Sequence, residues 1–244
     1  MKRVAATICA GWLLTVTPAF AGPPYVTDDP QPTDLGKYEI YLFAGGTTTA
    51  GGSGGAGGID FNYGAAPDLQ LTAVLPLAWD APHSGPAAAS LGNIELAAKY
   101  KFLHQDEFGV DVAFFPRVFL PAGSASVGER HAALLLPIWI GRTWGNWSTF
   151  GGGGCTLNNG GGSRNFCQLG WTLTNQITPQ LQIGAEVYHQ SADSIGGDAS
   201  TGAGLGAIYD LNENFHLLAS LGRGIQNVDA TNRVSWYTAL LLTF

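Results

Sequence analysis

The 244-residue chain lacks any long hydrophobic run after its first residues. The best later stretch, 132–141, has about half of the roughly 20 residues that a membrane helix needs, and it contains Pro137. If the chain crosses a bilayer beyond its N-terminus, it must therefore cross as a closed β-barrel, because only a closed barrel or a helix satisfies its own backbone groups in lipid.

Basic residues are also scarce, since 11 Lys and Arg stand against 18 Asp and Glu. Lys2 and Arg3 precede a mostly apolar stretch, 4–16, and Ala19 and Ala21 form an A-x-A cleavage pattern. Residues 1–21 are therefore predicted to be a removed secretory signal peptide, with a retained anchor helix as the alternative. Removal leaves nine basic residues and a formal charge of −9, which argues against nucleic acid as a partner.

Cysteine is rare, with three in the chain, and Cys9 lies in the predicted signal. In an exported protein the remaining pair, Cys155 and Cys167, is most simply a disulfide. It would close a loop of about a dozen residues and contribute about 3 kcal/mol against the unfolded chain. Two cysteines without a nearby histidine make a poor metal site, so no metal and no cofactor are expected.

From Gly36 onward, segments of about ten residues alternate polar and apolar positions, which predicts β-strands. Five short connections contain the Pro, Gly, Asn or Asp that turns require, namely 65–68, 103–107, 143–146, 177–180 and 210–214. Six longer connections alternate with them, near 44–56, 80–90, 121–130, 152–165, 191–198 and 225–231. The all-β fold predicted for residues 36–244 is a transmembrane, antiparallel, up-and-down β-barrel of about 12 strands with both ends on the periplasmic side.

A soluble sandwich would show the same alternation with its apolar face turned inward. The terminal Phe244 favours the barrel, because it closes a strand-like alternation in the way that a last barrel strand does. Aromatic residues near predicted strand ends favour it too, as in the girdles at membrane interfaces: Trp79, Trp144, Trp147, Trp171, Tyr209 and Trp236. We therefore expect the bacterial outer membrane as location, its lipid as surroundings, and the outer-membrane assembly machinery as a partner that recognises Phe244.

Three prolines disagree with regular strands. Pro76, Pro116 and Pro137 fall inside predicted strands, where each removes a hydrogen-bond donor. Pro76 and Pro116 are expected near the outer rim, at bulges, whereas nothing in the pattern accounts for Pro137. Before the first strand, the segment 22–35 is rich in Pro and Asp and is predicted to be a periplasmic extension or a plug in the barrel mouth.

Several motifs follow one another along the whole mature chain. They are TDDP at 27–30, FNYG at 61–64, LGNIEL at 91–96, FPR at 115–117, LPAG at 120–123, the WGxWxxxGGGG stretch at 144–154, Gly170-Trp171 and NENFHLL at 212–218. In these motifs the chain resembles an outer-membrane barrel family labelled transporter or "MetA-pathway of phenol degradation". The resemblance implies uptake or transport of small molecules, sometimes linked to aromatic catabolism, and no catalytic residues. Cys155 and Cys167 stand where we would expect aromatic residues.

Patterns that suggest catalysis are weak. The Gly-rich stretch 51–57 matches a hydrolase elbow and a dinucleotide motif, but without the surrounding strand, turn and helix that either needs. Ser191 and His189 lie near a strand end and leave an outer-membrane lipid hydrolase as an alternative function. The remaining histidines show no metal spacing: His83, His104, His131 and His216.

The polar faces of the strands carry the residues expected to line the lumen and the solute pathway: Glu39, Glu95, Lys99, Asp111, Arg117 and Glu186, with the aromatic Tyr41, Phe115 and Tyr188. If paired, the charges would simply fill a narrow barrel, and if left open they would form a selective constriction. The function predicted is a monomeric passive channel or uptake protein, not an enzyme, for small solutes that include aromatic ones. Lys99 and Arg117 would bind anionic or phenolic groups, and a non-conducting structural barrel is the further alternative.

Overall fold

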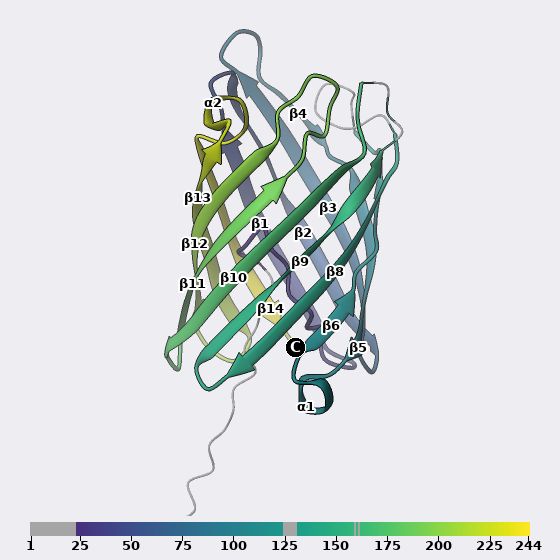
Figure 1. Ribbon diagram of the computed structural model, residues 1–244, viewed down its shortest axis with the longest axis vertical. Helices are drawn as coiled ribbons and strands as arrows, with labels where there is room; N and C mark the ends of the chain where they lie inside the picture. The colour runs from purple at the N-terminus through teal and green to yellow at the C-terminus, as the bar shows by residue number, and fades with distance from the viewer. Residues whose placement is uncertain (1–22, 124–130, 159, 161) are drawn as a thin grey trace, which may run out of the picture.

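The computed structural model describes residues 23–244 except 124–130, 159 and 161. Figure 1 shows a single barrel of tilted strands. In these residues the strands are β1 (Tyr38–Thr48), β2 (Gly52–Ala66), β3 (Leu69–Pro82), β4 (Ala88–Leu91), β5 (Ile94–Leu103), β6 (Asp111–Phe114), β7 (Arg117–Leu120), β8 (Ala133–Trp144), β9 (Trp147–Asn158), β10 (Phe166–Thr178), β11 (Leu181–Gln190), β12 (Ser200–Asp210), β13 (Phe215–Gln226) and β14 (Val234–Thr243).

These strands form a closed antiparallel barrel. β4 and β5 both pair with β3, and β6 and β7 both pair with β5 and β8, so each couple is one interrupted strand. β1 pairs with β14 from Glu39 and Thr243 to Thr48 and Val234, which closes the sheet. Counting each interrupted couple once gives 12 strands among the described residues, and the predicted fold class is confirmed.

The prolines explain both interruptions. Pro76 lies in the middle of β3, and its carbonyl accepts the amide of Gly92 in the gap between β4 and β5. Pro116 lies in the gap between β6 and β7, and Phe115 in the same gap donates to the carbonyl of Pro137. Because proline has no amide proton, the neighbouring strand loses its regular ladder at that level. The bulge expected at Pro76 is confirmed, because the pairing with β3 shifts by one residue between Leu77–Leu91 and Val74–Glu95. The expected rim position of Pro76 was wrong, since it lies in the middle of β3. No bulge occurs at Pro116, where the registers with β5 and β8 continue unshifted.

The long connections are shorter than predicted, because two glycine-rich runs belong to strands. β2 already begins at Gly52, so only 49–51 connect it to β1, and the run 151–154 lies within β9. The error has a physical source, because glycine usually weakens a strand but fits where another group approaches closely. At Gly151 a Cβ would collide with the ring of Trp171 on the neighbouring strand β10.

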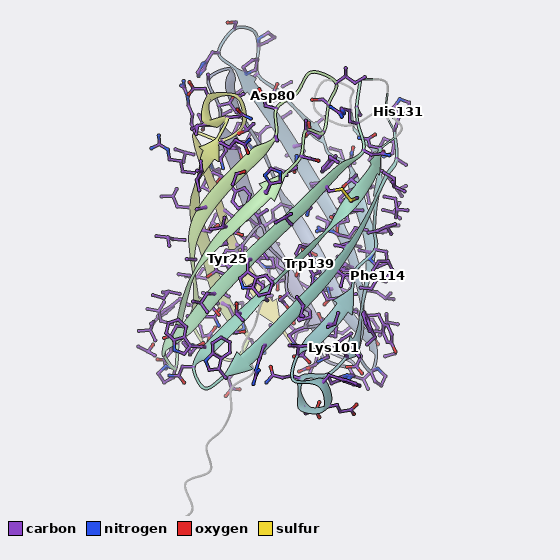
Figure 2. The ribbon with its side chains drawn as sticks, viewed as in Figure 1. Tyr25, Asp80, Lys101, Phe114, His131 and Trp139 are labelled. Carbon is purple, nitrogen blue, oxygen red and sulfur yellow. A yellow bond between two sulfur atoms is a disulfide. The ribbon has the colours of Figure 1, made fainter. Side chains whose placement is uncertain are left out.

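The two faces of the wall differ in polarity. In β11, Glu186 is 5% exposed, whereas its neighbour Val187 is 54% exposed. Leucine, isoleucine and valine side chains likewise project from the outer surface along most strands, as Figure 2 shows. Polar and charged side chains therefore gather inside the barrel, as the alternation predicted.

Figure 1 shows α1 (Gln105–Phe108) at the same end of the barrel as the C-terminus, and α2 (Val228–Thr231) at the other end. Over the described ranges, no helix combines the length and the apolar character needed to cross a membrane. At the end with α1, the backbones of Tyr38 and Phe244 exchange two hydrogen bonds, so the first and last strands begin and finish together.

Candidate functional site in the lumen

The segment 23–35 lies inside the barrel. The hydroxyl of Tyr25 donates to the carbonyl of Gly206 in β12 at 3.2 Å, and Ser220 in β13 donates to the carbonyl of Pro24 at 2.7 Å. The Tyr25 ring also meets the ring of Phe150 edge to face. Figure 2 shows Tyr25 within the outline of the barrel. We call residues 23–35 the plug segment, after one of the two placements that the sequence analysis left open. The predicted signal peptide, 1–21, lies outside the described residues.

Glu186 holds the backbone of the plug segment. Its carboxylate accepts the amides of Val26 and Thr27 at 3.0–3.1 Å, and it also accepts the Thr27 hydroxyl at 3.1 Å. Hydrogen bonds to a charged acceptor are among the stronger ones in proteins. The carboxylate of Glu186 is therefore occupied by the chain itself.

Lys99 and Asp111 bind the plug segment from the opposite part of the wall. The ammonium group of Lys99 lies 2.9 Å from the carboxylate of Asp28 and also donates to the carbonyl of Gln31 at 3.3 Å. The side-chain amide of Gln31 donates to Asp111 at 2.7 Å and accepts from Lys101 at 2.9 Å. These strands hold the plug segment through charge and side-chain hydrogen bonds.

A buried polar cluster that the sequence analysis did not single out extends these contacts. The amide and the hydroxyl of Thr33 donate to the side-chain oxygen of Gln70. The side-chain amide nitrogen of Gln70 donates to the side-chain oxygen of Asn62 at 2.7 Å. The hydroxyl of Thr72 donates to the same Asn62 oxygen. Asn62, Gln70 and Thr72 lie on the buried faces of β2 and β3, so strand alternation could have found them.

Arg117 and Glu95 form a two-point ion pair in the lumen. The guanidinium group donates from Nε at 2.7 Å and from Nη2 at 2.8 Å to the two carboxylate oxygens. Arg117 and Lys99 also lie over the ring of Phe115, at 5.3 and 4.8 Å from its centre. Both cations predicted to bind solutes are therefore already paired within the chain.

Wall glycines make room for the plug segment. A Cβ on Gly206 would meet atoms of Tyr25 and Pro24, and a Cβ on Gly170 would collide with the hydroxyl of Thr27. The same closeness recurs between Gly141 and Pro30. Each glycine lies on the lumen face, so on this side of the barrel the plug segment packs directly against the backbone of the wall.

Among the described residues, two cavities border the plug segment. The wider one, about 490 Å³, lies toward the long connections and is lined by Val26, Thr27, Trp139 and Tyr188, among others. The narrower one, about 220 Å³, lies deeper in the barrel, and Val26 lines it too. Its lining includes six predicted pathway residues, namely Glu39, Tyr41, Glu95, Lys99, Phe115 and Arg117, together with Asp28, Asp60, Asn62 and Gln70.

The other predicted pathway residues are placed differently. Asp111 and Glu186 face the lumen but contact the plug segment instead of either cavity. Tyr188 lines the wider cavity, where its hydroxyl accepts from Asn232 at 2.6 Å. All nine predicted residues thus point inward, and their part in solute passage stays a prediction.

Asp29 is the most deeply buried acid of the plug segment. It is fully buried, and one of its oxygens accepts the amide of Gln31. The other oxygen has no hydrogen-bond partner within the part of the chain that the structure describes. Burial raises the pKa of Asp29 to about 7, although the nearby ammonium group of Lys99 acts in the opposite direction. The seated plug segment therefore favours the protonated carboxyl.

The structure gives the hydrolase alternative no support. Ser191 accepts the amide of Cys167, and His189 lies 2.8 Å from the hydroxyl of Thr201. No hydrogen bond among the described residues joins Ser191 to His189, and within the same ranges no group of three or more His, Cys, Asp or Glu could hold a metal ion. Cys155 and Cys167 form a disulfide at paired positions of β9 and β10.

Comparison with protein families gives a match over residues 27–241 to the family described as "Putative MetA-pathway of phenol degradation". No curated protein matches the chain.

Solved structures with the same architecture are outer-membrane barrels. The COG4313 outer membrane channel from Pseudomonas putida F1 is 15% identical with a TM-score of 0.73, covering 88% of this chain and 98% of its own. A KdgM porin in complex with disordered oligogalacturonate is 10% identical with a TM-score of 0.61, over 84% of this chain and 99% of the porin. The NanC porin is 8% identical with a TM-score of 0.61, and the match covers 84% of this chain and 98% of the porin. This likeness shows the fold, and it agrees with the predicted location in the outer membrane.

Proposed function

Because the chain belongs to the family described as "Putative MetA-pathway of phenol degradation", and because its lumen keeps open space, we propose that it is a passive channel for small solutes, aromatic ones included. Solutes would diffuse past the plug segment, from the wider cavity into the narrower one. The similar solved structures are channels and porins, which supports a channel as the function.

One observation carries this proposal: the plug segment leaves two cavities, and Val26 borders both. Their walls offer polar groups along with the rings of Phe115 and Tyr188, on which a flat solute could stack. A pathway of this size admits small molecules only, because the plug segment occupies much of the cross-section.

A non-conducting barrel is the second candidate, and the pairing of charges favours it. Lys99, Arg117 and Glu186 are all bound within the chain, as expected of side chains that brace a narrow barrel. In this case the plug segment would be a structural filling and the barrel would serve as a scaffold for its surface connections.

Conductance in planar lipid bilayers separates the two candidates. The intact mature protein is compared with a variant that lacks residues 23–33, which keeps every strand but empties the lumen. A small, steady conductance of the intact protein and a much larger one of the variant support the channel. A silent intact protein beside a conducting variant overturns the channel and favours the structural barrel.

A further inference from the structure

We infer that the channel passes cations in preference to anions, because the surplus charge along both cavities is acidic. This inference rests on the proposed channel function and adds the class of solute that the channel favours. The narrower cavity brings four carboxylates, on Asp28, Glu39, Asp60 and Glu95, together with only two cationic groups, on Lys99 and Arg117.

Both cations are neutralised locally. Lys99 lies 2.9 Å from Asp28, and Arg117 binds both oxygens of Glu95. The side chain of Lys99 is 5% exposed and that of Glu95 8%, so these pairs are shielded from water. Close pairs of opposite charge cancel over distances larger than their own separation. Neither cation is thus left over to attract an anion.

Glu39 and Asp60 supply the surplus charge. Glu39 accepts the hydroxyl of Tyr41 at 3.3 Å, and Asp60 accepts the side-chain amide of Asn62 at 2.9 Å. These donors are neutral, and no salt bridge of either carboxylate occurs among the described residues. Asp60 pairs with Tyr41 across β1 and β2, which brings the two acids to the same part of the wall.

The wider cavity has the same sign of charge. Its described lining includes Asp193 and Asp198 but neither lysine nor arginine. The two cavities therefore present acidic groups in succession, toward the long connections and deep in the barrel. A charge of one sign inside a narrow space with low-dielectric walls concentrates the electric field and enriches the opposite ion.

The inference is tested by the reversal potential of the intact protein in a planar bilayer with a KCl gradient. The dilute side holds about 0.1 M salt, where charges act over about 10 Å. The buffer is kept near pH 8, well above the usual pKa of carboxylic acids. We expect K⁺ to permeate several times better than Cl⁻, and the preference to weaken at about 1 M salt, where screening is stronger.

Asp60→Asn and Glu39→Gln should each lower the ratio of K⁺ to Cl⁻ permeability, and the double variant should bring it near equality. Asp106→Asn in α1 and Glu213→Gln in the connection between β12 and β13 are matched controls, because each removes the same charge from an exposed residue. Both controls should keep the ratio of the unchanged protein.

Arg117→Gln tests the inference in the opposite direction, because it frees the wall residue Glu95 from its partner and should raise the K⁺ preference. Circular dichroism in detergent identifies variants that keep the strand content of the unchanged protein, and only these are compared. A conducting protein with equal permeabilities or a preference for Cl⁻ overturns the inference and leaves the channel intact. The absence of any conductance overturns the channel itself, so the two failures are distinguishable.

Discussion

Two parts of the barrel wall hold the same plug segment by different means. The strands β2 to β6 bind it through side chains, as in the pair of Lys99 with Asp28 and the hydrogen bonds of Gln70 to Thr33. The strands β8 to β12 approach it with bare backbone at Gly170 and Gly206, and Glu186 is the main charged group on that side. The strands β2 to β6, which we call the charged part, thus bind the polar and charged groups of the plug segment. The strands β8 to β12, which we call the glycine part, mainly pack closely against it.

The two parts of the wall therefore hold the plug segment differently: the charged part selects its side chains, and the glycine part lets its backbone pack closely. Burying charges is costly unless each has a partner, so the charged part needs complementary residues at fixed positions. Packing against glycine needs only room. We therefore expect substitutions on the charged part to release the plug segment more strongly than added volume on the glycine part.

Asp28→Asn should have the largest effect. It leaves Lys99 buried without its nearest counter-ion, which for buried pairs costs about 3–5 kcal/mol. The plug segment should be displaced in a larger fraction of molecules, and conductance should rise toward that of the variant lacking residues 23–33. Asp34→Asn, on the exposed end of the same segment, is the control and should leave the conductance unchanged. Equal conductance of both variants would show that the Lys99 pair does not hold the segment.

The glycine part also carries the disulfide. Replacing Cys155 and Cys167 by serine should lower the free energy of unfolding by about 3 kcal/mol, because the bridge restricts a loop of about a dozen residues in the unfolded chain. Urea unfolding followed by circular dichroism measures the change, and reducing agent should affect only the unchanged protein. Conductance should stay the same, since among the described residues neither cysteine is hydrogen-bonded to the plug segment or lines either of the two cavities described above.

Gly206→Val should displace the plug segment through volume alone. The added carbons would meet Tyr25 and Pro24, and forcing atoms into a packed site costs about 1–3 kcal/mol. Conductance should rise, but less than in Asp28→Asn. Ala207→Val adds a comparable volume to the outer face of the same strand and should leave conductance unchanged. A rise in both variants would point to distortion of β12 instead of release of the segment.

The smallest effect is a dependence on pH. Because burial raises the pKa of Asp29 from 3.8 to about 7, the seated plug segment holds a proton that the released segment gives up. The plug segment should therefore be bound in the lumen most strongly below about pH 4, and its binding should weaken as the pH rises to about 7. Conductance should be higher near pH 8 than near pH 5, and Asp29→Asn should reduce this difference. An unchanged pH profile in Asp29→Asn would exclude this carboxyl as its cause.

Alternation and turn chemistry were enough to predict the strands. The five short turns are hairpin connections in the structure, and they fixed the number of strands at 12. The glycine-rich residues 52–56 and 152–154 were wrongly assigned to connections, because low side-chain volume indicates a loop when the neighbouring strand is unknown. In the barrel, the run in β9 lies beside the bulky Trp171, which needs the space.

The lumen was predicted only in part. The alternation of polar and apolar residues placed Glu95, Lys99 and Arg117 on the inner face, but it could not show which residues they pair with. Lys99 meets Asp28 from 71 residues away, and the sequence left the segment that carries Asp28 as either an extension or a plug. Pairing of residues so far apart in the sequence depends on the closed shape of the barrel, which local sequence patterns do not show. Asp60 was missed because it lies in a glycine-rich strand that gave little alternation.

The seam between β1 and β14 imposes an order on biogenesis. Tyr41 pairs with Leu241, so the seam joins positions 200 residues apart. Contacts of such sequence separation are slow to form, because a large part of the chain must be ordered first. The plug segment is joined to the start of β1, and its contacts with β5 and β11 exist only once those strands are in place. Docking of the plug segment is thereby coupled to pairing of the wall strands. A newly folded barrel would conduct freely until the plug segment has docked.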